Sequence, residues 1–368
     1  MGKSFNAAAA GLCGLLALGA QASPRWNASD LIGLHDAIAG AKAEGLTDYD
    51  AEPILTLPPG DLTDVVADVV ALKLARDYFE GSAQIRDDRS WHIERPALDY
   101  RAWLDGALAR HSVRASFQNL LPNNDQYAAL KRGLRTCSTP ADCSRIAVNL
   151  DRLRAMPRDL GNRYVWVNVP AYRLDVVEDG RTVASHRVVV GKPGSQTPSF
   201  QARITGVTVN PWWNVPCSIV NESIGKLITT NPKEAARKGY VASKDANGKL
   251  VVRQKPGPEN ALGQIKLEMP NPFDVYIHDT PSRDLFARPT RAFSHGCIRT
   301  EDPKSLAVTI LGEGAETTVN LLLATGASRT LKLGQPMPVY VVYMTAEPAE
   351  DGTGRVLYHP DIYHRDGR

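Results

Sequence analysis

Cys297 lies in the segment Ser294-His295-Gly296-Cys297-Ile298-Arg299, and a second histidine, His278, precedes it by nineteen positions. A cysteine attacks a carbonyl carbon as the thiolate, so a nucleophilic cysteine needs a nearby base or positive group. His278 and His295 are both candidates for that base. These residue types and this spacing indicate a cysteine nucleophile that works with a histidine.

The choice between the two histidines depends on the strand that carries His278. Alternation along Val275-Tyr276-Ile277-His278 places Tyr276 and His278 on one face of a short strand. A base held at the end of a separate strand can be aimed at the sulfur independently, so we assign His278 as general base and acid. His295 lies two residues from Cys297 on an extended segment, which places both side chains on the same side. It is the alternative base, and if His278 is the base we expect His295 to be a supporting residue of the site.

Neighbouring residues complete the candidate site. Asp279 could orient the His278 ring through its backbone carbonyl or its carboxylate, unless its side chain only caps the loop. Successive N–H groups of Gly296 and Cys297 could form an oxyanion hole. Arg299 could bind a substrate carboxylate or only neutralise the pocket.

Three further residues are predicted to contact the substrate. Tyr276 and Ser294 border the base and the nucleophile in sequence. Trp213 belongs to the proline-bounded loop Asn210-Pro-Trp-Trp-Asn-Val-Pro216, whose adjacent tryptophans could line a groove or could instead cap one end of the β core.

The same site residues allow two other interpretations. His278, His295 and Cys297 are all zinc-ligand types, but their spacing fits no usual zinc signature and a fourth ligand is not evident. Alternatively, Cys297 is a buried, unreactive thiol. We expect neither a metal nor a cofactor.

Length and charge limit the classes of protein. A chain of 368 residues exceeds the usual size of one domain, which predicts two domains. The sequence has 43 Lys and Arg residues against 40 Asp and Glu residues, a formal net charge of +3. This mixed charge lacks the basic field that nucleic-acid binding needs, so we exclude nucleic acid as a partner.

The N-terminus has the pattern of a secretory leader. Lys3 precedes a small apolar run over 7–20, and Ala20-Gln21-Ala22 is a small-x-small cleavage motif. The run is short for a membrane span, so we predict that residues 1–22 are a signal peptide, with an uncleaved membrane anchor as the alternative.

Four cysteines follow the leader. In an oxidising compartment Cys137 and Cys143 are placed to close a small disulfide loop, and two unpaired thiols are the alternative. Cys297 is then free for chemistry. Cys217 is expected to pack rather than to react.

The periodicity changes from helical to β near Arg163. Before this point apolar residues recur at spacings of three and four, which predicts an all-α domain over 23–156. Its helices are expected around Leu31–Ile38, Leu62–Tyr78, Leu98–Leu108 and Gln126–Leu134.

The β-rich domain over 157–345 begins with strands joined by the hairpin turn Glu178-Asp179-Gly180-Arg181. A helical insertion over about 218–263 interrupts it. Downstream, the sequence predicts strands over Thr317–Leu323 and Val339–Thr345, a helix that begins at Asp302-Pro303, and a polar C-terminal tail over 346–368.

Taken together, His278 and the segment from Ser294 to Arg299 resemble the signature of the L,D-transpeptidases, the YkuD-domain family. The similarity extends to the long, two-domain periplasmic members, in which a helical scaffold precedes the catalytic domain. It rests there on Asn210-Pro-Trp-Trp-Asn-Val-Pro216, Pro256-Gly-Pro-Glu-Asn-Ala-Leu-Gly263 and Pro270-Asn-Pro-Phe-Asp-Val-Tyr-Ile-His-Asp-Thr-Pro281.

The resemblance implies an α+β protein in which the scaffold domain is followed by a largely β sandwich, with the insertion as a helical lid over the cleft. Cys297 would attack the carbonyl that follows the third residue of a peptidoglycan tetrapeptide stem, expel D-Ala and form a thioacyl-enzyme. The amine of a second stem peptide would resolve it as a 3→3 cross-link. Stem peptides would thus be donor and acceptor in the periplasm, other cell-wall enzymes would be partners, and carbapenems would be covalent inhibitors.

Two departures and two alternatives accompany this resemblance. Cys217 follows Asn-Val-Pro where an ordinary loop residue such as proline is expected, and if it lies near the cleft it could pair with Cys297 and switch the enzyme off. Long members often carry a peptidoglycan-binding module in the scaffold region, whereas the corresponding place here, between Leu134 and Leu150, holds only the Cys137–Cys143 loop. The same framework would suit a hydrolase that uses water, or an enzyme that attaches or releases lipoproteins. A non-catalytic wall-binding scaffold is the other alternative, against which the intact pair of His278 and Cys297 argues.

Overall fold

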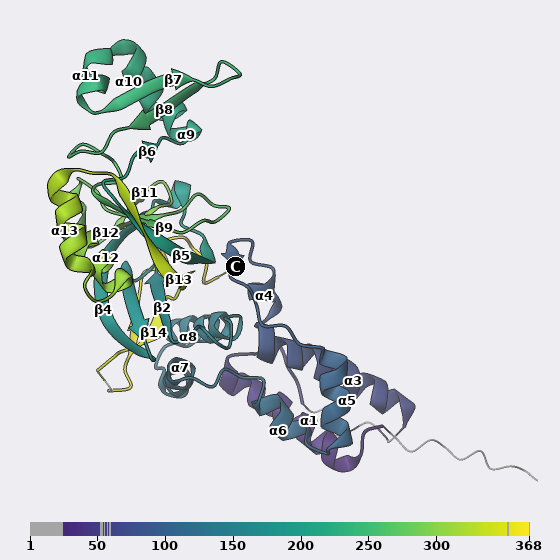
Figure 1. Cartoon of the computed structure of the whole chain (residues 1–368). Coiled ribbons are helices and arrows are strands. Elements are labelled where there is room, and N and C mark those ends of the chain that lie inside the picture. The colour runs from purple at the N-terminus through teal and green to yellow at the C-terminus, as the bar shows by residue number, and fades with distance from the viewer. Residues whose placement is uncertain are drawn as a thin grey trace, which may run out of the picture.

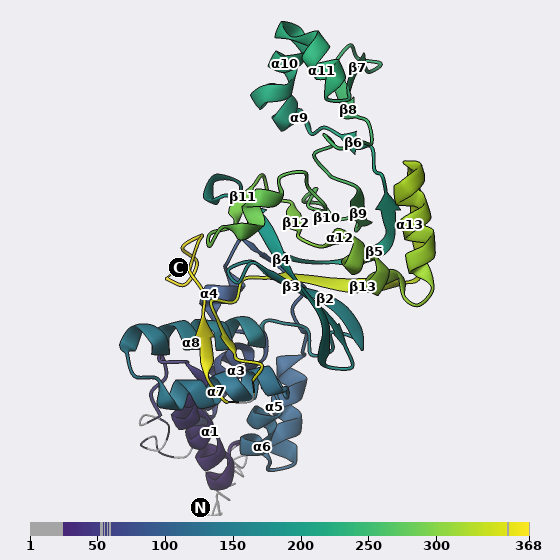
Figure 2. The same cartoon turned by 90° about the vertical axis from the view of Figure 1, so that its left-hand side faces the viewer.

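The computed structural model describes residues 25–51, 54, 56, 58, 60–351 and 353–367. The predicted signal peptide lies outside the described residues. Helices form one end of the molecule, a β-rich part forms the middle, and a smaller insertion forms the other end (Figures 1 and 2). None of the helices in these ranges is long and apolar enough to cross a membrane.

The N-terminal region is helical, as predicted. Between Trp26 and Leu120, most of its helices pack their inner faces into one apolar core that includes Leu34, Leu74 and Leu104. Helices α1, α3, α5 and α7 match the predicted ones, and the short α4 and α6 and the longer α8 are additional. The bounds are α1 (Ala28–Ala41), α3 (Asp61–Glu80), α4 (Ala83–Arg86), α5 (Tyr100–Ala109), α6 (Val113–Gln118), α7 (Asp125–Thr136) and α8 (Pro140–Arg154).

This helical region is joined to the β part by a strand and by a shared core. Strand β1 (Trp91–His92) pairs in parallel with β5 (Ser199–Val209), so the region is not purely α. Leu130 and Leu150 of helices α7 and α8 are buried in one cluster with Val342 of the β part. Because burial of apolar surface is the main favourable term in folding, the two parts stabilise each other.

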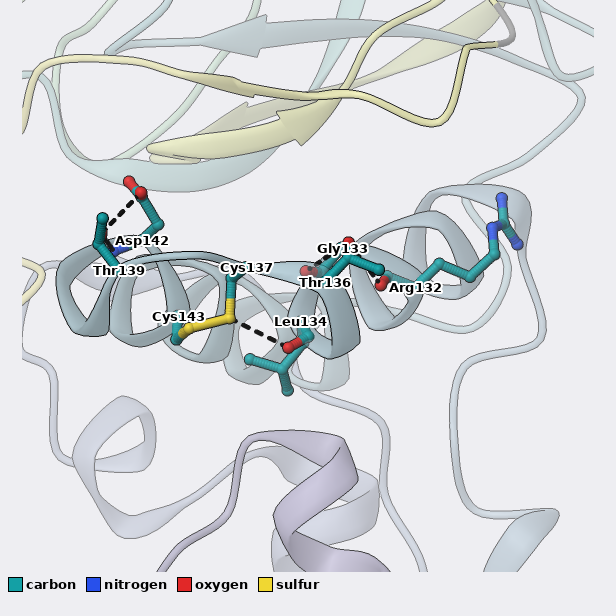
Figure 3. The surroundings of a disulfide bond; sticks show 8 residues. All are labelled: Arg132, Gly133, Leu134, Thr136, Cys137, Thr139, Asp142 and Cys143. Atoms are coloured by element: carbon teal, nitrogen blue, oxygen red, sulfur yellow. Dashed lines mark hydrogen bonds between the residues drawn. A yellow bond between two sulfur atoms is a disulfide. The ribbon is translucent and has the colours of Figure 1, made fainter.

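Cys137 and Cys143 form the predicted disulfide, which joins the end of α7 to the first turn of α8 (Figure 3). Their Cα atoms are 5.4 Å apart. Thr139 caps α8 by accepting the Asp142 N–H at 3.1 Å. The cap and the disulfide together fix the turn between the two helices.

We expect the double variant Cys137→Ser/Cys143→Ser to lose on the order of 2 kcal/mol of unfolding free energy, because the disulfide restricts a short loop of the unfolded chain. Urea unfolding of both proteins, with and without reductant, measures this. Reductant should destabilise the wild type by a similar amount and leave the double variant unchanged. Equal stability of the two proteins under oxidising conditions would contradict the expectation.

Among the described residues, eight strands of the β part close into a ring. They pair in the order β5, β13, β2, β3, β4, β12, β10, β9, and β9 pairs again with β5. The domain is largely β, as the resemblance implies, but its strands form a closed barrel instead of a sandwich, because β5 pairs with β13 on one side and with β9 on the other. Besides β5, the bounds are β2 (Arg163–Asn168), β3 (Arg173–Glu178), β4 (Arg181–Gly191), β9 (Ile265–Glu268), β10 (Ile277–His278), β12 (Ile298–Thr300) and β13 (Arg329–Val342).

Two helices pack into the core of this barrel. Helix α12 (Pro303–Leu311) begins as predicted, with Asp302 accepting the Ser305 N–H at 3.0 Å. The predicted strand over Thr317–Leu323 is wrong, because this segment lies in helix α13 (Ala315–Thr325). Its Val319 and Leu322 are buried three residues apart, which is helical spacing, while Leu321 is exposed.

The predicted polar tail over 346–368 is folded in its described part. Strands β14 (Ala346–Pro348) and β15 (Val356–Tyr358) pair with each other. Tyr363 is buried and stacks on Tyr343 with ring centroids 5.4 Å apart, and Arg152 of α8 donates to Asp366 Oδ1 at 2.8 Å. The segment over 346–368 is polar in composition, and this led to the prediction of a tail. In the fold its charged side chains are paired, which allows the segment to pack.

The insertion is a small α+β unit rather than a purely helical one. It stands at the far end of the barrel from the helical region (Figures 1 and 2). A three-stranded sheet in the order β6, β8, β7 packs with its helices around Val215, Val220 and Val252. The bounds are β6 (Trp213–Asn214), α9 (Cys217–Ile219), a π-helical turn (Val220–Ile224), α10 (Gly225–Thr230), α11 (Pro232–Arg237), β7 (Tyr240–Lys244) and β8 (Leu250–Gln254).

Candidate active site

Two neighbouring strands bring the predicted base and nucleophile together. Strand β10 pairs in parallel with β12, with Ile277 opposite Ile298 and His278 opposite Arg299. Both isoleucines are fully buried, which fixes this register, because a slip of one residue would turn them toward solvent. Cys297 directly precedes β12, so the register gathers His278, Cys297 and Arg299 on adjacent strands.

The His278 ring is buried and its tautomer is fixed by the backbone. Its Nδ1 lies 2.5 Å from the Asp279 carbonyl oxygen. A carbonyl only accepts, so Nδ1 carries the proton and Nε2 keeps a lone pair. Burial lowers the pKa of His278 to about 3, and the charge of Arg299 acts in the same direction. The ring is therefore neutral at ordinary pH and able to accept a proton.

The Cys297 thiol is half-buried and forms no disulfide. Cys217, the other free cysteine among the described residues, lies in the insertion and is exposed. Burial raises the pKa of the Cys297 thiol, while a hydrogen bond from the Tyr276 backbone and the charge of Arg299 act against that rise. The resting site is thus a neutral thiol near a neutral imidazole. Attack then requires a base that takes the thiol proton as the new bond forms.

The loop around Cys297 is held by its own hydrogen bonds. Ser294 Oγ donates to the Cys297 carbonyl at 2.5 Å and accepts the Gly296 N–H at 3.1 Å. Thr197 Oγ1 donates to the Gly296 carbonyl at 2.8 Å. Gly296 has φ 118°, a region that strongly favours glycine.

These contacts change the roles predicted for two loop residues. Ser294 is 1% exposed and its hydroxyl serves the loop, so the structure gives it a positioning role rather than a substrate contact. The Gly296 N–H is already engaged, which leaves the Cys297 N–H as the available one of the two predicted oxyanion donors.

Asp279 contacts the base through its carbonyl, which is one of the two predicted ways. Its carboxylate is used elsewhere, since Oδ2 accepts the Gln264 N–H at 2.8 Å and Oδ1 pairs with Arg283 Nη1 at 2.9 Å. Gly263 approaches this carboxylate closely. A Cβ placed on Gly263, whose φ is 62°, would lie 2.3 Å from the Asp279 carboxylate.

Gly263→Ala is therefore expected to displace Asp279 and misalign the His278 ring. We expect acylation of Cys297 by a β-lactam to slow roughly 10-fold or more, because small misplacements of a reacting group are costly. Stopped-flow acylation kinetics measure this. Gly180→Ala is the matched control, because its φ of 75° imposes similar backbone strain but no atom lies within 4 Å of the added carbon. Equal acylation rates in the two variants would argue against a role for the Gly263 contact.

Two cations lie beside the thiol and the base. Strand β9 places Lys266 opposite His278, and its Nζ lies 4.1 Å from the centroid of the Tyr276 ring. Arg299 is half-buried, burial lowers its pKa, and its Nε has no hydrogen-bond partner among the described residues. This Nε is itself buried, so the structure leaves open the two predicted roles of Arg299, binding a substrate carboxylate and neutralising the pocket. Lys266 was not predicted to belong to the site. Its neighbours Ile265 and Leu267 are buried, so alternation along the strand turns Lys266 away from the core.

Trp213 is placed in the insertion rather than beside the thiol. It packs against the small core of Val215, Val220 and Val252. Its neighbour Trp212 is partly exposed beneath the Arg253 guanidinium. The position of Trp213 favours a packing role over the predicted substrate contact.

His295 is half-exposed and faces the insertion. Its Nε2 lies 3.1 Å from Glu222 Oε2 in the π-helical turn. This contact ties the predicted lid to the nucleophile loop. His295 thus lacks the burial and the fixed tautomer that distinguish His278.

Two family models match the chain. The model of the L,D-transpeptidase catalytic domain, YkuD, matches residues 162–341, and a model described as a scaffold domain matches residues 21–134. The chain is also 30% identical over 334 residues to a protein of Haemophilus influenzae that is itself only provisionally described as an L,D-transpeptidase. This similarity covers 82% of the chain and 67% of the relative.

Solved L,D-transpeptidase structures overlap with about half of the chain. A mutant enzyme from Enterococcus faecium matches 51% of this chain and 52% of its own, with 14% identity and a TM-score of 0.27. L,D-transpeptidase 3 from Mycobacterium tuberculosis, in complex with a faropenem-derived adduct, matches 49% and 60%, with 14% identity and a TM-score of 0.25. The chain thus spans less than two thirds of the length of each of these two proteins.

Proposed function

Since the chain belongs to the L,D-transpeptidase family, with a YkuD catalytic domain and an N-terminal scaffold domain, we propose that it forms 3→3 peptidoglycan cross-links through a thioacyl-enzyme on Cys297. The observation that carries this proposal is the pairing of β10 with β12. It sets the buried, neutral His278 beside the strand that follows the free Cys297 thiol.

In the first half-reaction the Cys297 sulfur attacks the carbonyl carbon of the third residue of a tetrapeptide stem. His278 Nε2 takes the thiol proton as the S–C bond forms, and the Cys297 N–H stabilises the negative oxygen. His278 then returns the proton to the departing nitrogen. The C–N bond breaks, D-Ala leaves, and a thioester remains on Cys297.

In the second half-reaction an amine of a second stem peptide attacks the thioester. The new amide bond forms as the C–S bond breaks, and the proton lost from nitrogen returns to the sulfur by way of His278. No ATP is needed, because the energy of the broken peptide bond is kept in the thioester.

Incubation of the purified protein with disaccharide tetrapeptides, followed by mass spectrometry, tests the proposal. We expect release of D-Ala and formation of dimers. Monomeric tripeptide as the sole product would replace the transpeptidase with the hydrolase on the same framework. Absence of any D-Ala release would favour the non-catalytic scaffold.

We also propose that the N-terminal leader directs export and that the protein works in the periplasm, where stem peptides and other cell-wall enzymes would meet it. The disulfide supports this proposal, because disulfides persist in oxidising compartments. N-terminal sequencing of protein from the periplasmic fraction tests it. A mature chain that starts at Ser23 is expected, whereas an intact leader in the membrane fraction would favour the anchor.

A further inference from the structure

Helix α3 is apolar on two opposite sides. Its inner side packs into the core of the helical region through four buried residues, Ala67, Ala71, Leu74 and Tyr78. A helix at the surface of a protein normally has one apolar side, which faces the core, and one polar side, which faces water. The outward side of α3 departs from this pattern.

This outward side carries a second row of apolar residues, which we call the outer stripe: Leu62, Val65, Val69 and Leu72. Three of them are well exposed, at 68% for Leu62, 61% for Val65 and 63% for Val69, and Leu72 is partly buried. They follow one another at alternating spacings of three and four residues, the pattern by which two helices pack side by side. Apolar residues exposed singly are ordinary, but a row along one helix face marks an interaction surface.

Two exposed charges of opposite sign flank the outer stripe. Asp61 lies beside its N-terminal end and Lys73 beside its C-terminal end. Within the part of the chain that the structure describes, neither side chain forms an ion pair, and the Lys73 ammonium lies 4.7 Å from the centroid of the Tyr49 ring. The helix rises roughly 18 Å from residue 61 to residue 73, so these two charges cannot pair within one chain.

We propose that the outer stripe is the contact surface of a homodimer, in which two α3 helices pack antiparallel about a two-fold axis. In this arrangement Leu62 of one protomer lies against the partner's Leu72, and Val65 lies against the partner's Val69. The two-fold axis repeats each contact. All four residues of the outer stripe are thereby covered on both chains.

The charges favour a second copy of this chain in this direction. The register that pairs the apolar residues also sets Asp61 opposite the partner's Lys73, and the two-fold axis forms this pair twice. A parallel pair would instead bring like charges together, which costs stability. A surface of anionic lipids fits less well, because the first turn of α3 is acidic, with Asp61 and Asp64.

The outer stripe offers one helix from each chain, which is a smaller contact than that of a permanent dimer. We therefore expect a concentration-dependent dimer with a Kd on the order of 10 μM. The inference is independent of the proposed transpeptidase function, because it concerns the helical region. This region lies at the opposite end of the molecule from the insertion (Figures 1 and 2).

Sedimentation velocity of the purified protein from about 1 to about 200 μM tests the proposal. We expect the wild type to pass from monomer to dimer over this range. Val65→Glu/Val69→Glu should stay monomeric, because dimerisation would bury unpaired charges at the centre of the contact. Leu321→Glu is the matched control, because Leu321 is also 61% exposed but lies on α13, and this variant should dimerise as the wild type does.

Exchange of the flanking charges tests the direction of packing. Asp61→Lys and Lys73→Asp should each raise the Kd roughly 10-fold, because each variant sets like charges opposite one another twice. The double variant Asp61→Lys/Lys73→Asp should return the Kd to within about 3-fold of the wild type, since the pair is restored with its signs reversed. Thermal unfolding of each variant checks that it is folded.

A wild type that stays monomeric up to about 200 μM would overturn the proposal, and this is the result expected if lipid or another protein covers the outer stripe. A dimer that persists in Val65→Glu/Val69→Glu would overturn it as well, because the contact would then lie elsewhere. Failure of the double charge exchange to restore dimerisation, with each single exchange weakening it, would reject the antiparallel register.

Discussion

Replacing Cys297 with alanine is expected to abolish both D-Ala release from tetrapeptide stems and covalent trapping by a carbapenem. The thiol is the attacking group of the proposed mechanism, and no other described cysteine is free except the exposed Cys217. Without the sulfur neither a thioester nor a carbapenem adduct can form. Intact-mass measurement after incubation with a carbapenem should show one adduct on the wild type and none on Cys297→Ala.

Cys217→Ala provides the matched control for this experiment. It removes the other free thiol, which lies in the insertion, and should retain the adduct. An adduct that persists in Cys297→Ala, or one that disappears in Cys217→Ala, would show that the nucleophile is assigned wrongly. Peptide mapping of the adduct would then locate the reactive residue.

Replacing His278 with glutamine is expected to slow acylation of Cys297 by roughly 10²–10⁴-fold, the usual contribution of general acid–base catalysis. His295→Gln should cost far less in this step. The physical difference is that His278 is buried with its Nε2 lone pair available, whereas His295 is half-exposed and pairs with Glu222. Stopped-flow acylation of both variants measures the contrast, and thermal unfolding checks that each is folded. Equal losses in the two variants would leave the choice of base unsupported.

The pH dependence of acylation distinguishes this base from an ordinary histidine. Burial lowers the pKa of His278 to about 3, so the neutral, proton-accepting form persists as pH falls and is lost only near that value. We therefore expect no fall in the acylation rate between pH 8 and about 5, where a histidine with the usual pKa of about 6.5 would become protonated. A fall centred near pH 6.5 would show that the ring is more hydrated in solution than its burial implies.

The site could be predicted from the sequence where its parts depend on short-range patterns. Alternation along the strand that ends at His278 has a direct structural cause, because Ile277 is buried in the core and turns its neighbours to the other face. The pairing of Cys137 with Cys143 was likewise predictable from their short spacing together with the expected oxidising compartment. In both cases local sequence determines the geometry.

The contact between the insertion and the nucleophile loop could not be predicted in the same way. Lys192, Glu222 and His295 are far apart in sequence, and they meet only because β11 (Ala292–Ser294) pairs with β4 and the insertion approaches the same loop. Composition also misled the prediction for residues 317–323, where β-branched residues suggest a strand but the burial of Val319 and Leu322 has helical spacing. Tertiary packing decided these segments.

The folded C-terminal segment supports the nucleophile loop from behind. The Tyr363 hydroxyl donates to the Gly191 carbonyl at 2.5 Å and accepts the Thr197 N–H at 3.2 Å, and Thr197 in turn holds Gly296. A premature stop codon after Thr345 would leave every residue of the recognisable motif in the gene product. A search for the motif would score such a truncated gene as intact, although the protein that it encodes would have lost the support behind its thiol.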